Sequence, residues 1–241
     1  MLVIGYGAKI CWVTMRVKAE NRMVTLLVEK CDLLKDAILK QNRNRSCIKR
    51  NIENIAEFKS YVDEILFRQE YDILLKDDSF FQFERNMRGD QIVYKYVFMQ
   101  NPLIKISFDD YCKKYQIDLE YEDIDCIKDI YNEDESEEVC KMLNFPLYIR
   151  YDVDDRGYIP NLHSYSHLHI GVSEDIRIPV SKILSPPAFV NLVIKMVYPS
   201  NWKHIISASL NDSKIYDFKR LCEKLPDKFW NSCELRDVFL T

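Results

Sequence analysis

The sequence predicts an α+β protein in which an antiparallel sheet is joined to an N-terminal helical hairpin and covered on one face by C-terminal helices. Three patterns lead to this fold class. Apolar residues recur at helical spacing before residue 70, alternate with polar residues in segments between 80 and 180, and return to helical spacing after 185. We expect one domain over residues 1–241, with the helical hairpin at 20–75, a sheet-containing core at 78–210 and C-terminal helices at 211–241.

The composition is that of a globular protein. Of 241 residues, 47% are hydrophobic and 12% are aromatic, which is ample for a packed core. The sequence Gly5-Tyr-Gly7 lacks the third glycine of a dinucleotide-binding turn, so a Rossmann fold is excluded. Eight cysteines include no C-x-x-C pair, which favours reduced, structural thiols and disfavours a zinc site built from cysteine pairs.

The first residues raise the question of targeting. Met1–Val17 is largely apolar, but no basic leader precedes it and Lys9 interrupts it, so we expect a partly buried strand or an ill-defined terminus. No later window reaches the roughly 20 uninterrupted apolar residues of a membrane helix. We therefore expect a soluble, cytoplasmic protein without a membrane contact, and the sequence leaves its oligomeric state open.

The predicted helical hairpin encloses a basic stretch. Val24–Leu39 and Ile52–Leu66 carry apolar residues at helical spacing, and Asn51 or Ser46 would cap the second helix. Between them, Lys40–Arg50 holds five bases and no acid. Its candidate nucleic-acid-binding residues are Arg43, Arg45, Lys49 and Arg50. Such cations neutralise phosphates, although a solvated loop whose bases complement the preceding helix dipole explains the same residues.

An acidic segment offsets this basic character. Eleven acids and one base lie between Asp118 and Glu138, so the rest of the chain is net basic although the whole carries a charge of -4. We interpret the segment first as a solvated loop or frayed helix, and second as an intramolecular cover for the basic stretch.

The first strands form a predicted β-hairpin. Phe80–Glu84 and Gln91–Met99 are rich in aromatic and β-branched residues, and the turn-like Asn86–Asp90 separates them. Pro102 ends the hairpin, and Phe108–Tyr115 is expected to form a short helix.

Three further strands are expected to pair as a meander. They are Leu147–Asp154, the histidine strand around His167 and His169, and Asp175–Val180, in which Pro179 favours an edge position. Alternation turns Leu168 and Ile170 toward the core. The opposite, outward face would collect Arg150, Asp152, His167, His169 and Arg177.

The C-terminal part returns to helical spacing. Ser185-Pro186-Pro187 is typical of a helix start, with serine as the N-cap and proline in the first turn, and Tyr198-Pro199 would end that helix. Beyond Asp212, apolar spacing before Pro226 and a final aromatic group predict further helices. This aromatic group would join the core or dock a partner.

The histidines carry the chemistry that the sequence suggests. Three of the four, His163, His167 and His169, lie within seven residues. In one scheme, His167 and His169 act as general acid and base on a phosphodiester, with Arg177 or Arg150 stabilising the charge that develops; this scheme needs no metal. In a second scheme, both imidazoles and Asp152 hold one divalent metal.

Two points stay open at this stage. His163 has the same strand parity as His167 and would join either scheme. The same side chains also suit a hydrogen-bonded network that only orients strands, because such networks fix imidazoles without catalysing anything.

Several motifs resemble a known family. The stretches Ser166–Gly171 (SHLHIG), Arg177–Pro179 (RIP) and Ser185–Ile194 (SPPAFVNLVI) are similar to an uncharacterised family of bacterial proteins that is classed as a domain of unknown function. The resemblance is strongest from Leu147 to Trp202. It implies no established activity.

We therefore expect a nucleic-acid-associated protein with nuclease-like phosphoester chemistry at the His/Asp/Arg face. The alternative is a non-catalytic interaction module, an accessory or antitoxin-like subunit whose basic stretch or C-terminal aromatic group binds a protein partner.

Overall fold

The computed structural model describes residues 20–38, 52, 54–88, 91–134, 136–172, 176–208, 218–232, 234–236 and 240. Its centre is a seven-stranded antiparallel sheet of order β1-β2-β3-β4-β7-β8-β9. The strands are β1 (Leu34–Ala37), β2 (Ile73–Leu75), β3 (Phe80–Arg88), β4 (Gln91–Met99), β7 (Tyr148–Val153), β8 (Ser166–Ile170) and β9 (Arg177–Pro179). The α+β prediction is confirmed, as is the edge position of the strand that carries Pro179.

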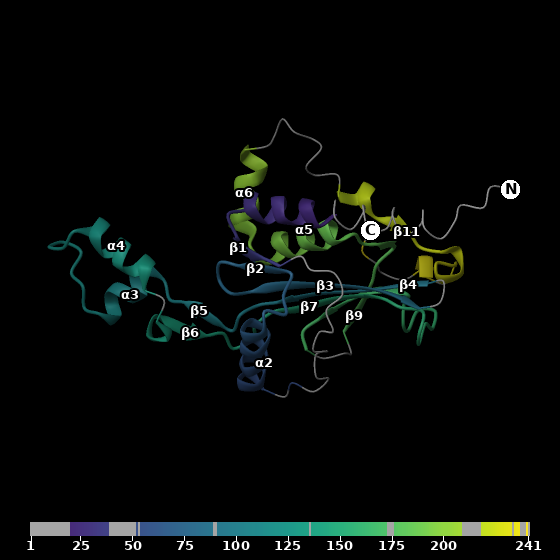
Figure 1. Cartoon of the computed structure of the whole chain (residues 1–241), viewed down its shortest axis with the longest axis horizontal. Coiled ribbons are helices and arrows are strands. Elements are labelled where there is room, and N and C mark those ends of the chain that lie inside the picture. The colour runs from purple at the N-terminus through teal and green to yellow at the C-terminus, as the bar shows by residue number, and fades with distance from the viewer. Residues whose placement is uncertain are drawn as a thin grey trace.

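Helices cover both faces of this sheet (Figure 1). The helix over residues 20–30 and the helices α5 (Pro186–Val197) and α6 (Pro199–Ala208) lie on one face, and α2 (Ile55–Arg68) lies on the other. Because neighbouring strand residues point to opposite faces, adjacent residues of β3 enter different cores. Phe81 packs in the core of α5, whereas Phe80 packs in the core of α2.

The N-terminal helices differ from the predicted hairpin in extent and packing. The first helix ends near residue 30, and Leu34–Ala37, expected to be helical, pairs with β2 as a strand. Leu34 and Ile38 are four residues apart, a spacing that puts side chains on one face in a helix and in a strand alike. The second helix begins at Ile55, and Asn54 rather than Asn51 or Ser46 caps it. The two helices therefore contribute to separate cores on opposite faces of the sheet.

An arm is inserted in the chain connection between β4 and β7. These two strands are paired, with Met99 opposite Tyr148, so the residues between them form an insertion at a hairpin connection. Figure 1 shows the arm projecting from one end of the sheet. It contains β5 (Leu103–Lys105), α3 (Phe108–Lys114), α4 (Ile124–Glu133), η1 (Glu137–Val139) and β6 (Cys140–Met142). The acidic segment lies on this arm, and α4 has no buried residue.

The C-terminal elements confirm one prediction and correct another. Ser185 caps α5 by accepting a hydrogen bond from the backbone N–H of Ala188. In the described part of 211–241, however, the expected α-helices are short 3-10 turns. These elements are η3 (Phe218–Leu221), η4 (Asp227–Phe229) and η5 (Glu234–Arg236), with β11 (Glu223–Lys224) pairing β10 (Lys182–Ile183). Pro226 separates the pieces and prevents a continuous helix. None of the described helices has the length and apolar character needed to cross a membrane.

Candidate His/Asp centre

Strand pairing brings the predicted polar side chains together. In the register of β7 and β8, Asp152 is opposite His167 and Arg150 is opposite His169. In the register of β8 and β9, Arg177 is opposite His169. Alternation along these strands leaves Leu168 in the opposite core, where 2% of its surface is exposed. The common face predicted from alternation is therefore confirmed.

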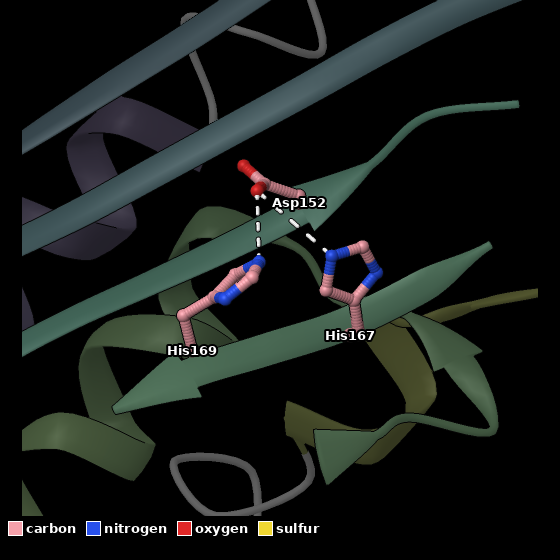
Figure 2. A group of neighbouring side chains, drawn as sticks. All are labelled: Asp152, His167 and His169. Atoms are coloured by element: carbon pink, nitrogen blue, oxygen red, sulfur yellow. Dashed lines mark ion pairs between the residues drawn. The ribbon is translucent and has the colours of Figure 1, made fainter. Parts of the chain in front are cut away.

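One carboxylate oxygen is the common point of the cluster. Oδ2 of Asp152 lies 2.8 Å from Nε of Arg150, 3.4 Å from Nε2 of His169 and 4.0 Å from Nε2 of His167. Figure 2 shows the two imidazoles, both from β8, turned toward the carboxylate on β7. Potential ligand atoms of Asp152, His167 and His169 all lie within 4.8 Å of one another. The cluster is thus a compact set of two nitrogen donors and one oxygen donor.

The hydrogen bond of His167 determines which ring nitrogen carries a proton. Nδ1 lies 2.6 Å from the backbone carbonyl oxygen of Ser164, and a carbonyl only accepts, so Nδ1–H is the donor. Burial lowers the pKa of His167 to about 4, even though the neighbouring Asp152 favours the charged form. The neutral ring therefore turns the lone pair of Nε2 toward Asp152. Two acceptors then face each other, an arrangement that a cation between them would stabilise.

The ring of His169 is incompletely paired. Its Nδ1 is buried and has no hydrogen-bond partner among the described residues. Burial of Asp152 opposes ionisation, but the polar contact with the His169 ring and the charge of Arg150 outweigh it and lower the pKa of the carboxyl. Asp152 is therefore an anion at neutral pH and lies next to the His169 ring, which has a buried nitrogen without a partner among the described residues.

Burial is the main departure from the expected site. His167 and His169 point away from the α5 core as predicted, but each is only 2% exposed. The side chains of Arg150 and Asp152 are 15% and 19% exposed. Access to the cluster is therefore better on the Arg150–Asp152 side than through the imidazoles.

The other predicted residues lie at different distances from the cluster. The ring of His163 contacts that of His167, with 5.0 Å between centroids. Burial and the charge of Arg177 lower the pKa of His163, so Arg177 acts electrostatically on the histidine row while its own side chain is exposed. The candidate nucleic-acid-binding residues Arg43, Arg45, Lys49 and Arg50 lie outside the described residues.

Sequence reasoning did not find two residues that support His167. Ser164 supplies the carbonyl that holds Nδ1, and Glu234 contacts the Ser164 side chain. Ser164 lies inside the histidine stretch, where its type gave no signal. Glu234 lies far along the chain, and only tertiary packing brings it to the loop.

Comparison with known proteins gives one match. Residues 26–229 match the model of a family described as an uncharacterised conserved protein (DUF2290). No curated protein and no solved structure shows a significant match.

Proposed function

The chain belongs to the DUF2290 family, whose description assigns no activity, and we propose from its His/Asp centre that it is a metal-dependent phosphoester hydrolase acting on nucleic acid. Asp152, His167 and His169 are the proposed ligands of one divalent transition metal. The observation that carries this proposal is the opposition of the His167 Nε2 lone pair and the Asp152 carboxylate.

The distances support a shared cation better than a purely hydrogen-bonded network. An N–H···O hydrogen bond is usually about 2.7–3.2 Å long. Tetrahedral ligands at ~2.1 Å from a zinc ion lie about 3.4 Å from each other. His169 and Asp152 already have this separation at 3.4 Å, whereas His167 lies 4.0 Å from Asp152 and the three donor atoms spread over up to 4.8 Å, so the His167 ring has to move inward to complete the site.

The surroundings also resemble those of metal-binding histidines. Such histidines generally donate their second ring nitrogen to a carbonyl or carboxylate, which fixes the tautomer. His167 does so through Nδ1 to Ser164. Three protein ligands leave a coordination position open, which is typical of catalytic rather than structural sites.

Metal-free acid–base catalysis fits less well. A general acid or base needs contact with its substrate and a pKa near the working pH. His167 and His169 are nearly inaccessible, and the pKa of His167 is near 4. These properties suit metal ligands, which are buried and bind in the deprotonated form.

The proposed reaction is hydrolysis of a phosphate ester. When bound, the metal supplies a Lewis acid that lowers the pKa of water and stabilises charge on the phosphoryl oxygens. Water adds to phosphorus, one ester P–O bond breaks, and the departing alcohol oxygen takes the proton. Arg150 holds the Asp152 ligand in place, and the exposed Arg177 would attract the phosphate.

Nucleic acid is the proposed substrate class because of the basic residues of the chain. Arg43, Arg45, Lys49 and Arg50 would bind phosphates of the polymer backbone, with an affinity that falls as salt rises. A cytoplasmic location belongs to the same proposal and agrees with the free thiols of Cys31, Cys112, Cys126 and Cys140.

The test measures metal and activity on the same full-length samples. The wild type, His167→Ala and His169→Ala are stripped with a chelator, checked for folding by circular dichroism and titrated with Zn²⁺, Mn²⁺ or Co²⁺. Each sample is then incubated with RNA, single-stranded DNA and a small phosphodiester. We expect one metal per chain and hydrolysis in the wild type, and loss of both in the variants. A folded wild type that neither binds a metal nor cleaves any substrate rules the proposal out.

A second candidate, a non-catalytic interaction module, is favoured by the burial of both histidines. In that case the contact of His169 with Asp152 joins β8 to β7, and Arg150 fixes the carboxylate within β7, without any metal. Such a module predicts no stoichiometric metal, whereas the hydrolase requires it.

A further inference from the structure

The C-terminal segment packs against the loop that precedes the histidine strand β8. The ring of Phe229 stacks on that of Tyr165 with centroids 4.0 Å apart, and it meets Tyr158 edge-on at 5.1 Å. Asn231 adds a contact of its side-chain amide with the hydroxyl of Tyr158 at 3.4 Å. Phe229 and Asn231, which are distant in sequence, therefore contact the 158–165 loop.

Glu234 is the polar centre of this contact. Its surface is 1% exposed, and its two carboxylate oxygens accept from different parts of the loop. Oε2 accepts from the hydroxyl of Ser164 at 3.2 Å, and Oε1 accepts from the backbone N–H of Asn161 at 3.3 Å. These hydrogen bonds offset the cost of burying the polar side chain of Glu234.

The same loop supplies the acceptor for His167. The carbonyl of Ser164 receives the hydrogen bond from Nδ1, while the Ser164 side chain is tied to Glu234. Asn161 has a φ of 61°, in the left-handed region, so the turn depends on contacts that hold it there. A chain of contacts thus runs from Glu234 through Ser164 to Nδ1 of His167, whose other nitrogen faces Asp152.

We infer that Glu234 is a positioning residue that sets the tautomer and direction of His167, and thereby the geometry of the metal site on which the proposed function rests. Its effect is indirect, because it touches no proposed ligand. Groups that hydrogen-bond a metal ligand directly typically change metal affinity 10–100-fold when they are mutated, and Glu234 acts one contact further out. We expect the lower end of this range for Glu234.

The test uses the full-length chain with Glu234→Gln and Ser164→Ala. The first replaces one carboxylate oxygen by an amide N–H group, which cannot accept the hydroxyl proton of Ser164 or the backbone N–H of Asn161. The second keeps the Ser164 backbone carbonyl and removes only the hydroxyl contact. Asp227→Asn is the matched control, because Asp227 is an exposed acid in the neighbouring turn η4. Cobalt affinity is measured by titration, and the His167 tautomer in the metal-free protein is read from imidazole ¹⁵N chemical shifts.

The expected result has two parts. Glu234→Gln weakens cobalt binding about tenfold and replaces the single Nδ1–H signal of His167 by the signals of a mixture of tautomers. Ser164→Ala has a smaller effect on both measurements. Asp227→Asn changes neither. Unchanged affinity and an unchanged tautomer in folded Glu234→Gln would overturn the inference while leaving the metal site intact. If the wild type binds no cobalt, the proposed function fails, and the tautomer signal alone still decides the role of Glu234.

Discussion

Nε2 of His169 lies 3.4 Å from Oδ2 of Asp152, which is long for a hydrogen bond between an imidazole and a carboxylate. The two groups come from neighbouring strands, and Arg150 occupies the same carboxylate oxygen at 2.8 Å. Arg150 thus supplies the shorter contact to this oxygen, and His169 the longer one. A bound cation would use this gap without moving the strands.

Metal should stabilise the wild type in proportion to its concentration. A ligand that binds only the folded state at 100 times its Kd adds about 2.7 kcal/mol. We expect the Tm to rise with added Zn²⁺ or Co²⁺ in the wild type but not in Asp152→Asn, which keeps the shape of the side chain. Asp109→Asn, an exposed acid on α3, is the control and should follow the wild type. Equal responses in all three proteins would assign the effect to non-specific binding.

Acid should destabilise the metal-free protein before its carboxylates titrate. His167 has a folded-state pKa of about 4, whereas the imidazole of an unfolded chain titrates near 6.5. The unfolded state therefore binds more protons in this window, and stability is full above about pH 6.5 and falls as the pH drops toward 4. The loss from His167 alone is at most about 3 kcal/mol.

Urea unfolding of the chelated protein at several pH values measures this loss. His167→Gln removes the titrating group, so its stability should depend less steeply on pH between 6.5 and 4. If the wild type and His167→Gln show the same slope, another group is responsible for the acid sensitivity.

The inward side of the histidine strand should be the more sensitive to truncation. Leu168 is 2% exposed in the core of α5, and its truncation to alanine should cost about 2–5 kcal/mol of unfolding free energy. Leu162 belongs to the preceding loop and is 75% exposed, so Leu162→Ala should change stability by no more than about 0.5 kcal/mol. Chemical unfolding of both variants tests the assigned direction of β8. Comparable losses in the two variants would contradict it.

The arm should be dispensable for the sheet and for the His/Asp centre. β4 and β7 are direct neighbours, and Gln100 and Leu147 already exchange hydrogen bonds at the base of the arm. Replacing residues 101–146 by a turn of about four residues closes an ordinary hairpin. We expect cooperative unfolding and unchanged cobalt affinity. A shortened protein that is soluble but has lost its metal would show that the arm supports the site.

The sequence by itself determined which residues share a face. Strand alternation has a period of two and depends only on local geometry, so it placed His167, His169, Arg150 and Asp152 together before any packing was known. The Ser185 cap of α5 depends on neighbouring residues and was predictable for the same reason, whereas the cap of α2 is Asn54 and not the predicted Asn51 or Ser46.

Only the tertiary structure decided the rest. Leu34–Ala37 became a strand because β2 offered it an edge, although its spacing also suited a helix. The burial of His167 and His169, the tautomer of His167 and the contact with Glu234 all depend on segments distant along the chain. Burial and hydrogen-bond pairing are properties of the folded surface and its neighbours, and local spacing carries no information about them.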